Sequence, residues 1–83
     1  MNVLYFAWVR QKVGRSDEVI EHGPSLRTVG DLALLLASRG GGYAEAFADL
    51  RRLRAAVNQH HVGMDAPLAA GDEVAFFPPV TGG

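Results

Sequence analysis

The chain of 83 residues contains no cysteine. This absence excludes a disulfide framework, a cysteine-based zinc site, an iron–sulfur cluster and a catalytic thiol. A domain without such cross-links depends on apolar packing for its stability, and 48% of the residues are hydrophobic, which is enough for a folded core. The length predicts one domain and no more.

Surplus positive charge is also lacking, because eight basic side chains stand against nine acidic ones and give a net charge of −1. Neutralising phosphates requires a basic surplus, so we expect neither nucleic acid nor a membrane as a partner. No apolar run approaches the roughly 20 residues needed to cross a bilayer. The N-terminal residues also lack the pattern of a secretory signal, and we therefore expect a cytoplasmic protein.

Motifs for metals and phosphates are weak or missing. His60 and His61 are adjacent in the sequence, and neighbouring side chains on an extended chain point to opposite sides. We therefore expect no metal site. The three glycines at 40–42 lack the lysine of a phosphate-binding loop, and we interpret them as a helix stop.

Charged side chains cluster at two places. Three acidic residues on a predicted hairpin are spaced as on a solvated face: Asp17, Glu18 and Glu21. An acid–base pair would need a desolvated site, so we do not assign them that role. Three arginines form the one basic cluster: Arg51, Arg52 and Arg54. Two interpretations stay open for this cluster, a solvated helix end or a docking patch for an acidic partner.

Two apolar runs at opposite ends of the chain predict buried strands. Val3–Val9 and Glu73–Phe77 are apolar on both faces of an extended chain, so we expect both to be central in a sheet. A strand at Glu18–His22 is predicted to form a hairpin with the first of them. Further strands are predicted at Leu53–Asn58 and, more briefly, within 60–65.

One main helix is predicted between these strands. Thr28 is suited to N-cap it, and Asp31 follows at the spacing of a capping box. The glycines at 40–42 are expected to end it, and a shorter helix is predicted from Tyr43 to about Leu50. The main helix has one apolar face at helical spacing, formed by Val29, Leu32, Leu35 and Leu36.

Together these elements predict an α+β domain with a mixed sheet. Placing the two most apolar strands side by side in the middle buries both, and the main helix then covers one face. This is the ubiquitin-like β-grasp arrangement, predicted for residues 1–79, with residues 80–83 as a flexible C-terminal tail. A ferredoxin-like fold is the alternative, but it needs two helices of comparable length.

The C-terminal segment carries the clearest functional pattern. Pro78 and Pro79 end the last strand because neither can donate to a ladder. Gly82 and Gly83 have no Cβ, so their backbone could thread a channel too narrow for a side chain. The terminal carboxylate would then be the reactive group once a partner activates it, most simply by adenylation with ATP. Fraying of a chain end is the simpler interpretation of two glycines alone.

This segment closely resembles the small subunits of molybdopterin synthase, a family of sulfur-carrier proteins. The resemblance is carried by GDEVAFFPPVTGG at 71–83, VLYFA at 3–7 and AAVN at 55–58. It covers essentially the whole chain, and 40–53 is the least family-like part. Further matches are Arg10, Gly14, Thr28, Val29, Leu32, Pro67 and Leu68.

The resemblance implies a sulfur-donor subunit without catalytic side chains of its own. An adenylyltransferase similar to ubiquitin-activating enzymes would use ATP to adenylate Gly83, and sulfur transfer would convert the product to a thiocarboxylate. The sulfur would then pass to cyclic pyranopterin monophosphate on the large synthase subunit, which holds the catalytic residues, within a heterotetramer. This chain itself would bind no cofactor.

The resemblance also implies roles for individual residues. Gly83 would carry the sulfur, and the three residues before it would thread into the partner: Val80, Thr81 and Gly82. Five residues are expected to form the docking surface: Phe6, Arg10, Phe77, Pro78 and Pro79. The neighbouring Phe76, which alternates with Phe77 along the strand, is expected in the core.

Two other functions stay open. A carrier of the same kind could supply sulfur for thiamine-type biosynthesis, although the Phe-Phe-Pro-Pro run at 76–79 and the length favour molybdopterin. Alternatively, the tail could be joined to lysines of other proteins, as in a ubiquitin-like modifier. Lys12 is the only side-chain amine of this chain, so self-linked chains could form only there or at the N-terminal amine.

Overall fold

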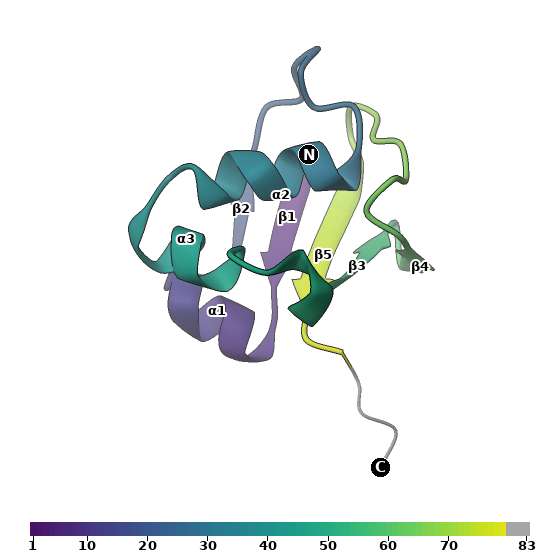
Figure 1. Ribbon diagram of the computed structural model, residues 1–83. Coiled ribbons are helices and arrows are strands. Elements are labelled where there is room, and N and C mark those ends of the chain that lie inside the picture. Colours follow the sequence, from purple (N-terminus) through teal and green to yellow (C-terminus); the bar gives the residue numbers. More distant parts are fainter. Residues whose placement is uncertain (80–83) are drawn as a thin grey trace.

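Figure 1 shows the computed structural model, in which residues 1–79 are described. The predicted tail, with Val80, Thr81, Gly82 and Gly83, lies outside the described residues. The elements are, in order, β1 (Asn2–Tyr5), α1 (Ala7–Val13), β2 (Asp17–Val19), α2 (Val29–Ala37), α3 (Gly41–Ala46), the 3₁₀-helix η1 (Leu50–Arg52), β3 (Arg54–Val57), β4 (His60–Val62) and β5 (Glu73–Phe77). No helix of residues 1–79 has the length and apolar character that a membrane crossing requires.

The five strands form one mixed sheet in the order β2-β1-β5-β3-β4. β1 and β5 lie in the middle and are parallel, with Asn2 opposite Glu73 and Tyr5 opposite Phe76. All other neighbouring strands are antiparallel. This is the predicted β-grasp, with the first and last strands side by side, and it excludes the ferredoxin-like alternative.

Helix α2 crosses one face of the sheet, and α1 and α3 lie beside it (Figure 1). The side chains of Val3, Val74 and Phe76 face these helices and are fully buried. Leu4 and Ala75, which alternate with them, are only partly buried on the other face. The expected burial of the central strands on both sides is therefore wrong, because the helices form a layer on one side only.

The first predicted strand is too long, because Val3–Val9 divides between β1 and α1. Ala7 has a positive φ of 53°, which turns the chain away from the sheet. Val9 and Val13 then face the core one helical turn apart, and Gly14 ends α1 with a φ of 89°. β1 and β2 pair as antiparallel neighbours, but a helix joins them in place of the predicted hairpin turn.

The N-terminus of α2 follows the prediction closely. The Thr28 hydroxyl accepts a hydrogen bond from the backbone N–H of Asp31 at 3.2 Å, and the Asp31 carboxylate accepts one from the Thr28 N–H at 3.1 Å. The capping box is therefore confirmed. The predicted apolar face is wrong at one position, since Leu35 is 39% exposed and Ala33 is buried in its place.

The interpretation of the glycines at 40–42 as the stop of the main helix is wrong, because α2 ends at Ala37 with Ser38 as its cap, and Gly40 caps the next helix. The second helix, α3, begins at Gly41, earlier than predicted, and packs against α1. Gly42 lies so close to α1 that a Cβ built on it would overlap the carbonyl oxygen of Lys12. Tyr43 and Phe47 both contact the core, and α3 ends at Ala46, before the predicted end near Leu50.

A nearly buried carboxylate joins three parts of the fold. Glu18 of β2, whose side chain is 7% exposed, accepts hydrogen bonds from the hydroxyls of Tyr5 and Tyr43 and from Nη1 of Arg39 at 2.8 Å. Its burial raises the pKa of the carboxyl, but these three hydrogen bonds lower it by more, so the pKa lies below its usual value. The interpretation of Glu18 as part of a solvated face is therefore wrong, whereas Asp17 and Glu21 are exposed.

Replacing this carboxylate by an amide is expected to destabilise the fold. In Glu18→Gln the amide loses the charge that pairs with Arg39, and we expect a loss of about 1–3 kcal/mol near neutral pH. Because the folded pKa is depressed, the wild-type advantage exists above the unfolded pKa near 4.5 and disappears as the pH falls through the folded value. Urea denaturation of both proteins from neutral to acidic pH measures this, with the exposed Glu21→Gln as control. An equal loss at all pH values would contradict it.

Candidate functional site

The candidate site is the end of β5, where the chain leaves the sheet. β5 ends at Phe77, and Pro78 and Pro79 follow without N–H groups, so the ladder cannot continue. All three side chains are partly buried. The roles predicted for residues 80–83 lie outside the described part of the chain, so the described site is the root from which that segment begins.

Phe77 lies on the face of the sheet that no helix covers. Its cross-strand partner on β3 is Arg54, and the ring of His61 from β4 lies 5.2 Å from its own. Leu4 and Ala75 are cross-strand partners on the same face. The open face therefore presents a small apolar surface that is continuous with the root of the C-terminal segment.

Phe6 and Arg10 belong to the same end of the molecule. The backbone N–H of Phe6 donates to the carbonyl of Phe76 at 3.1 Å, which places Phe6 beside the end of β5. Its side chain is 49% exposed, although it is a large apolar group. Arg10 lies one turn further along α1 and is exposed. The structure thus brings all five predicted docking residues to one end of the sheet, while their role in docking stays a prediction.

The arginine cluster lies at this end as well, and its members differ in their contacts. Arg51 is engaged with Asp49, whose carboxylate oxygens lie 3.0 and 3.2 Å from its guanidinium nitrogens. The hydrogen bonds from Arg51 hold the pKa of Asp49 below its usual value. Arg52 lies over the ring of Trp8 at 5.1 Å, and Nη1 of Arg54 donates to the carbonyls of Arg51 and Leu53.

Trp8 is a site residue that the sequence pattern did not reveal. The apolar run predicts it in the first strand, whereas it lies on α1 and joins that helix to η1 through Arg52. The signal that could have found it is the helical spacing of Val9 and Val13, followed by Gly14 as a C-terminal cap. Tryptophan beside arginine is also a common pair at protein interfaces.

Two adjacent histidines of β4 lie near this site. Among residues 1–79, no three His, Asp or Glu side chains are grouped so that they could hold an ion. His60 and His61 lie on β4, where His61 contacts Phe77. The described residues therefore form an apolar surface rimmed by arginines, and its chemistry is suited to binding.

Comparisons with known proteins place this site in context. A model of the ThiS family matches residues 3–83. The molybdopterin synthase sulfur carrier subunit of Escherichia coli is 47% identical over 83 residues, which cover 100% of this chain and 99% of that protein. A solved structure of a putative molybdopterin converting factor, subunit 1, from Pyrococcus furiosus is 30% identical with a TM-score of 0.69, covering 95% of both chains. SAMP1 from Haloferax volcanii is 26% identical with a TM-score of 0.73, covering 100% of this chain and 98% of that chain.

Proposed function

Because the chain belongs to the ThiS family, we propose that it is a sulfur-carrier subunit that serves molybdopterin synthase. The observation that carries the proposal is the full-length similarity to a sulfur carrier subunit of that enzyme, 47% identical. The geometry supports it, since the central strand β5 leads directly into the segment that ends at Gly82 and Gly83. A cytoplasmic location stays a prediction.

The chemistry of the carrier would reside on the main chain. We expect a carboxylate oxygen of Gly83 to attack the α-phosphorus of ATP on an adenylyltransferase, with pyrophosphate leaving. Hydrosulfide then attacks the acyl carbon, AMP leaves and the proton of the sulfide is released, so the product is a thiocarboxylate. A chain with no cysteine has no thiol for this purpose, and the terminal carbonyl group takes its place.

Sulfur transfer itself would take place on the large synthase subunit. The thiocarboxylate of Gly83 would donate to cyclic pyranopterin monophosphate there, in a heterotetramer of two small and two large subunits. The described residues of this chain would bind and position: Phe6, Phe77, Pro78 and Pro79 supply apolar surface at the root of the donor segment, and Arg10 supplies charge at its edge. An exposed apolar surface next to the segment that must enter a partner is typical of a protein interface.

Intact-mass measurement tests the carrier chemistry. Protein isolated from its native host, or coexpressed with an activating enzyme and a sulfur source, is expected to contain a form heavier by one exchange of oxygen for sulfur. Fragmentation should place the exchange on Gly83. Repeated failure to find this form under sulfur-replete conditions would count against the proposal.

Two alternative functions, a carrier for thiamine-type biosynthesis and a protein modifier, can be distinguished by mutant rescue and by a search for isopeptide bonds. Rescue of a thiamine-requiring mutant, without rescue of a mutant lacking molybdenum cofactor, would identify a carrier for thiamine-type biosynthesis. Gly83 found in isopeptide bonds to lysines of other proteins would identify a modifier. Rescue of the molybdenum-cofactor mutant alone supports the function proposed here.

A further inference from the structure

We propose that Arg52 and Arg54 bind carboxylates on the rim of the large synthase subunit when the C-terminal segment enters it. The inference rests on the proposed function, since it assigns the chemistry of one contact with that partner. It also decides between the two interpretations left open for the arginine cluster, in favour of a docking patch. Three observations support it: where the two guanidinium groups lie, what they contact and how many residues follow the end of β5 up to Gly83.

The two arginines lie on opposite sides of the chain as it leaves β5. Arg54 pairs with Phe77 across the β3–β5 ladder, so it lies at the open face of the sheet. Arg52 contacts Trp8 of α1, on the side of the sheet that carries the helices. Figure 1 shows α1 and the segment before β3 flanking the carboxyl end of β5. A partner that receives the segment following Pro79 must therefore approach both guanidinium groups.

Both groups keep hydrogen-bond donors available. The Arg52 guanidinium lies over the ring of Trp8, and its N–H groups donate no hydrogen bond to residues 1–79. Arg54 uses Nη1 for the carbonyls of Arg51 and Leu53, and its remaining nitrogens have no hydrogen bond to residues 1–79. Neither arginine forms an ion pair within that range. These contacts favour particular orientations of the two groups and so lower the entropy lost when a carboxylate binds.

The local charge favours an acidic protein surface. Arg51 and Asp49 neutralise one another, so Arg52 and Arg54 leave this end of η1 positive in a chain whose net charge is −1. A desolvated like charge opposite them would cost several kcal/mol, whereas carboxylates would be attracted during encounter. Complementary charge of this kind raises the association rate more than it lowers the dissociation rate.

The phosphates of the reaction partners are a poorer match for these arginines. Four residues follow Pro79, the last of them Gly83, and four residues span up to roughly 13 Å when extended. The guanidinium groups are held at the root, one by Trp8 and the other by backbone carbonyls. An adenylate on Gly83, or a pterin phosphate beside it, would therefore lie deep in the partner while the arginines remain at its entrance.

The test measures the association rate with the purified large synthase subunit from the same host at low and high salt. Arg52→Glu and Arg54→Glu are each expected to slow association about tenfold at low salt, with much of the difference removed at high salt. Arg52→Lys should keep most of the wild-type rate because it keeps the charge. Fluorescence of Trp8, the only tryptophan, reports whether each variant retains the fold around η1.

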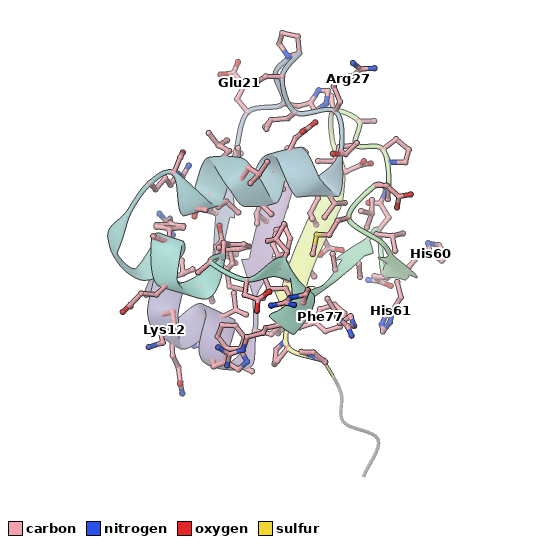
Figure 2. All side chains as sticks on the ribbon, viewed as in Figure 1. Lys12, Glu21, Arg27, His60, His61 and Phe77 are labelled. Atoms are coloured by element: carbon pink, nitrogen blue, oxygen red, sulfur yellow. The ribbon has the colours of Figure 1, made fainter. Side chains whose placement is uncertain are left out.

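Arg27→Glu is the matched control, because it makes the same change of charge at the opposite end of the sheet. Figure 2 shows Arg27 and Glu21 far from Phe77. Arg27 is exposed and takes part in none of the ion pairs among residues 1–79. Its association rate is expected to stay within about twofold of wild type. An equal loss for Arg27→Glu, or folded Arg52→Glu and Arg54→Glu variants that both associate at the wild-type rate, would overturn the proposal.

Failure of the proposed function has a different signature. If the wild-type chain does not bind the large subunit at all, and no thiocarboxylate forms on Gly83, the carrier function and the arginine contact are both wrong. If the wild-type chain binds and carries sulfur while the arginine variants associate normally, only the arginine contact is wrong.

Discussion

Deletion of Gly83 is expected to abolish sulfur transfer to the pterin while the fold remains intact. The deletion removes the acyl carbon that would hold the sulfur, and the new terminal carboxylate is one residue, roughly 3.3 Å, short of its place in the partner. Positioning errors of about 1 Å can cost about 100-fold in rate, so we expect a loss of at least about 1000-fold. Product formation by the reconstituted synthase measures it.

Within residues 1–79 the last buried side chain is that of Phe76, and we expect the melting temperature of this variant to equal that of the wild type. Addition of one glycine after Gly83 is the matched control for length and should also inactivate the carrier. Substantial activity in either variant would show that the terminal carboxylate is not the group that holds sulfur.

Replacement of Gly42 by alanine is expected to destabilise the domain more than any other single methyl addition at a glycine. The new Cβ would overlap the carbonyl oxygen of Lys12 and lie 2.8 Å from its carbonyl carbon, so α1 and α3 must separate. Alanine improves helix propensity by about 1 kcal/mol, but overpacking against a backbone costs about 1–3 kcal/mol or more. We expect a net loss of about 1–2 kcal/mol, which lowers the melting temperature by roughly 4–8 °C per kcal/mol.

Gly23→Ala provides the control for this experiment. A Cβ added at Gly23 would have no atom within 4 Å, and the residue has no positive φ, so the same methyl group meets open space there. Its melting temperature should be unchanged or slightly higher, because alanine restricts the unfolded chain. A Gly42→Ala protein as stable as Gly23→Ala would mean that the two helices are not packed as closely as described.

Features with a local cause could be predicted from the sequence. The capping box of Thr28 and Asp31 depends on residues three positions apart, and it has the predicted hydrogen bonds. The place of β5 in the middle of the sheet was predicted from its apolar pattern, and the observed strand order confirms it. The end of β5 at Pro78 was predictable because proline cannot donate to a ladder.

Features that depend on distant residues could not be predicted in this way. The partners of Glu18 lie 13, 21 and 25 residues away, so nothing beside it in the sequence marks it as nearly buried. The first helix was missed because an apolar run of seven residues suits a strand or a helix equally well. The close approach of Gly42 to Lys12 likewise depends on the packing of α3 against α1.

In the candidate site, too, the features that depend on neighbouring residues could be predicted, and those that depend on distant residues could not. The apolar members Phe77, Pro78 and Pro79 stand in one run of sequence, and the resemblance pointed to them directly. The contact of Arg52 with Trp8 joins residues from two elements, and the sequence showed only that arginines were clustered. The open face of the sheet was missed because successive residues of β5 are apolar, a pattern that is typical of a strand buried on both faces.

The parallel pairing of β1 with β5 also governs when the domain can fold. Asn2 lies opposite Glu73, about 70 residues away, so closing the middle of the sheet carries the loop entropy of nearly the whole chain. During synthesis, β1 cannot pair with β5 until the residues of β5 have been made. Contacts between residues so far apart in the sequence slow folding. Products that stop before Glu73 lack a central strand and cannot form the surface around Phe77. Partners that bind this surface would therefore discriminate against incomplete chains.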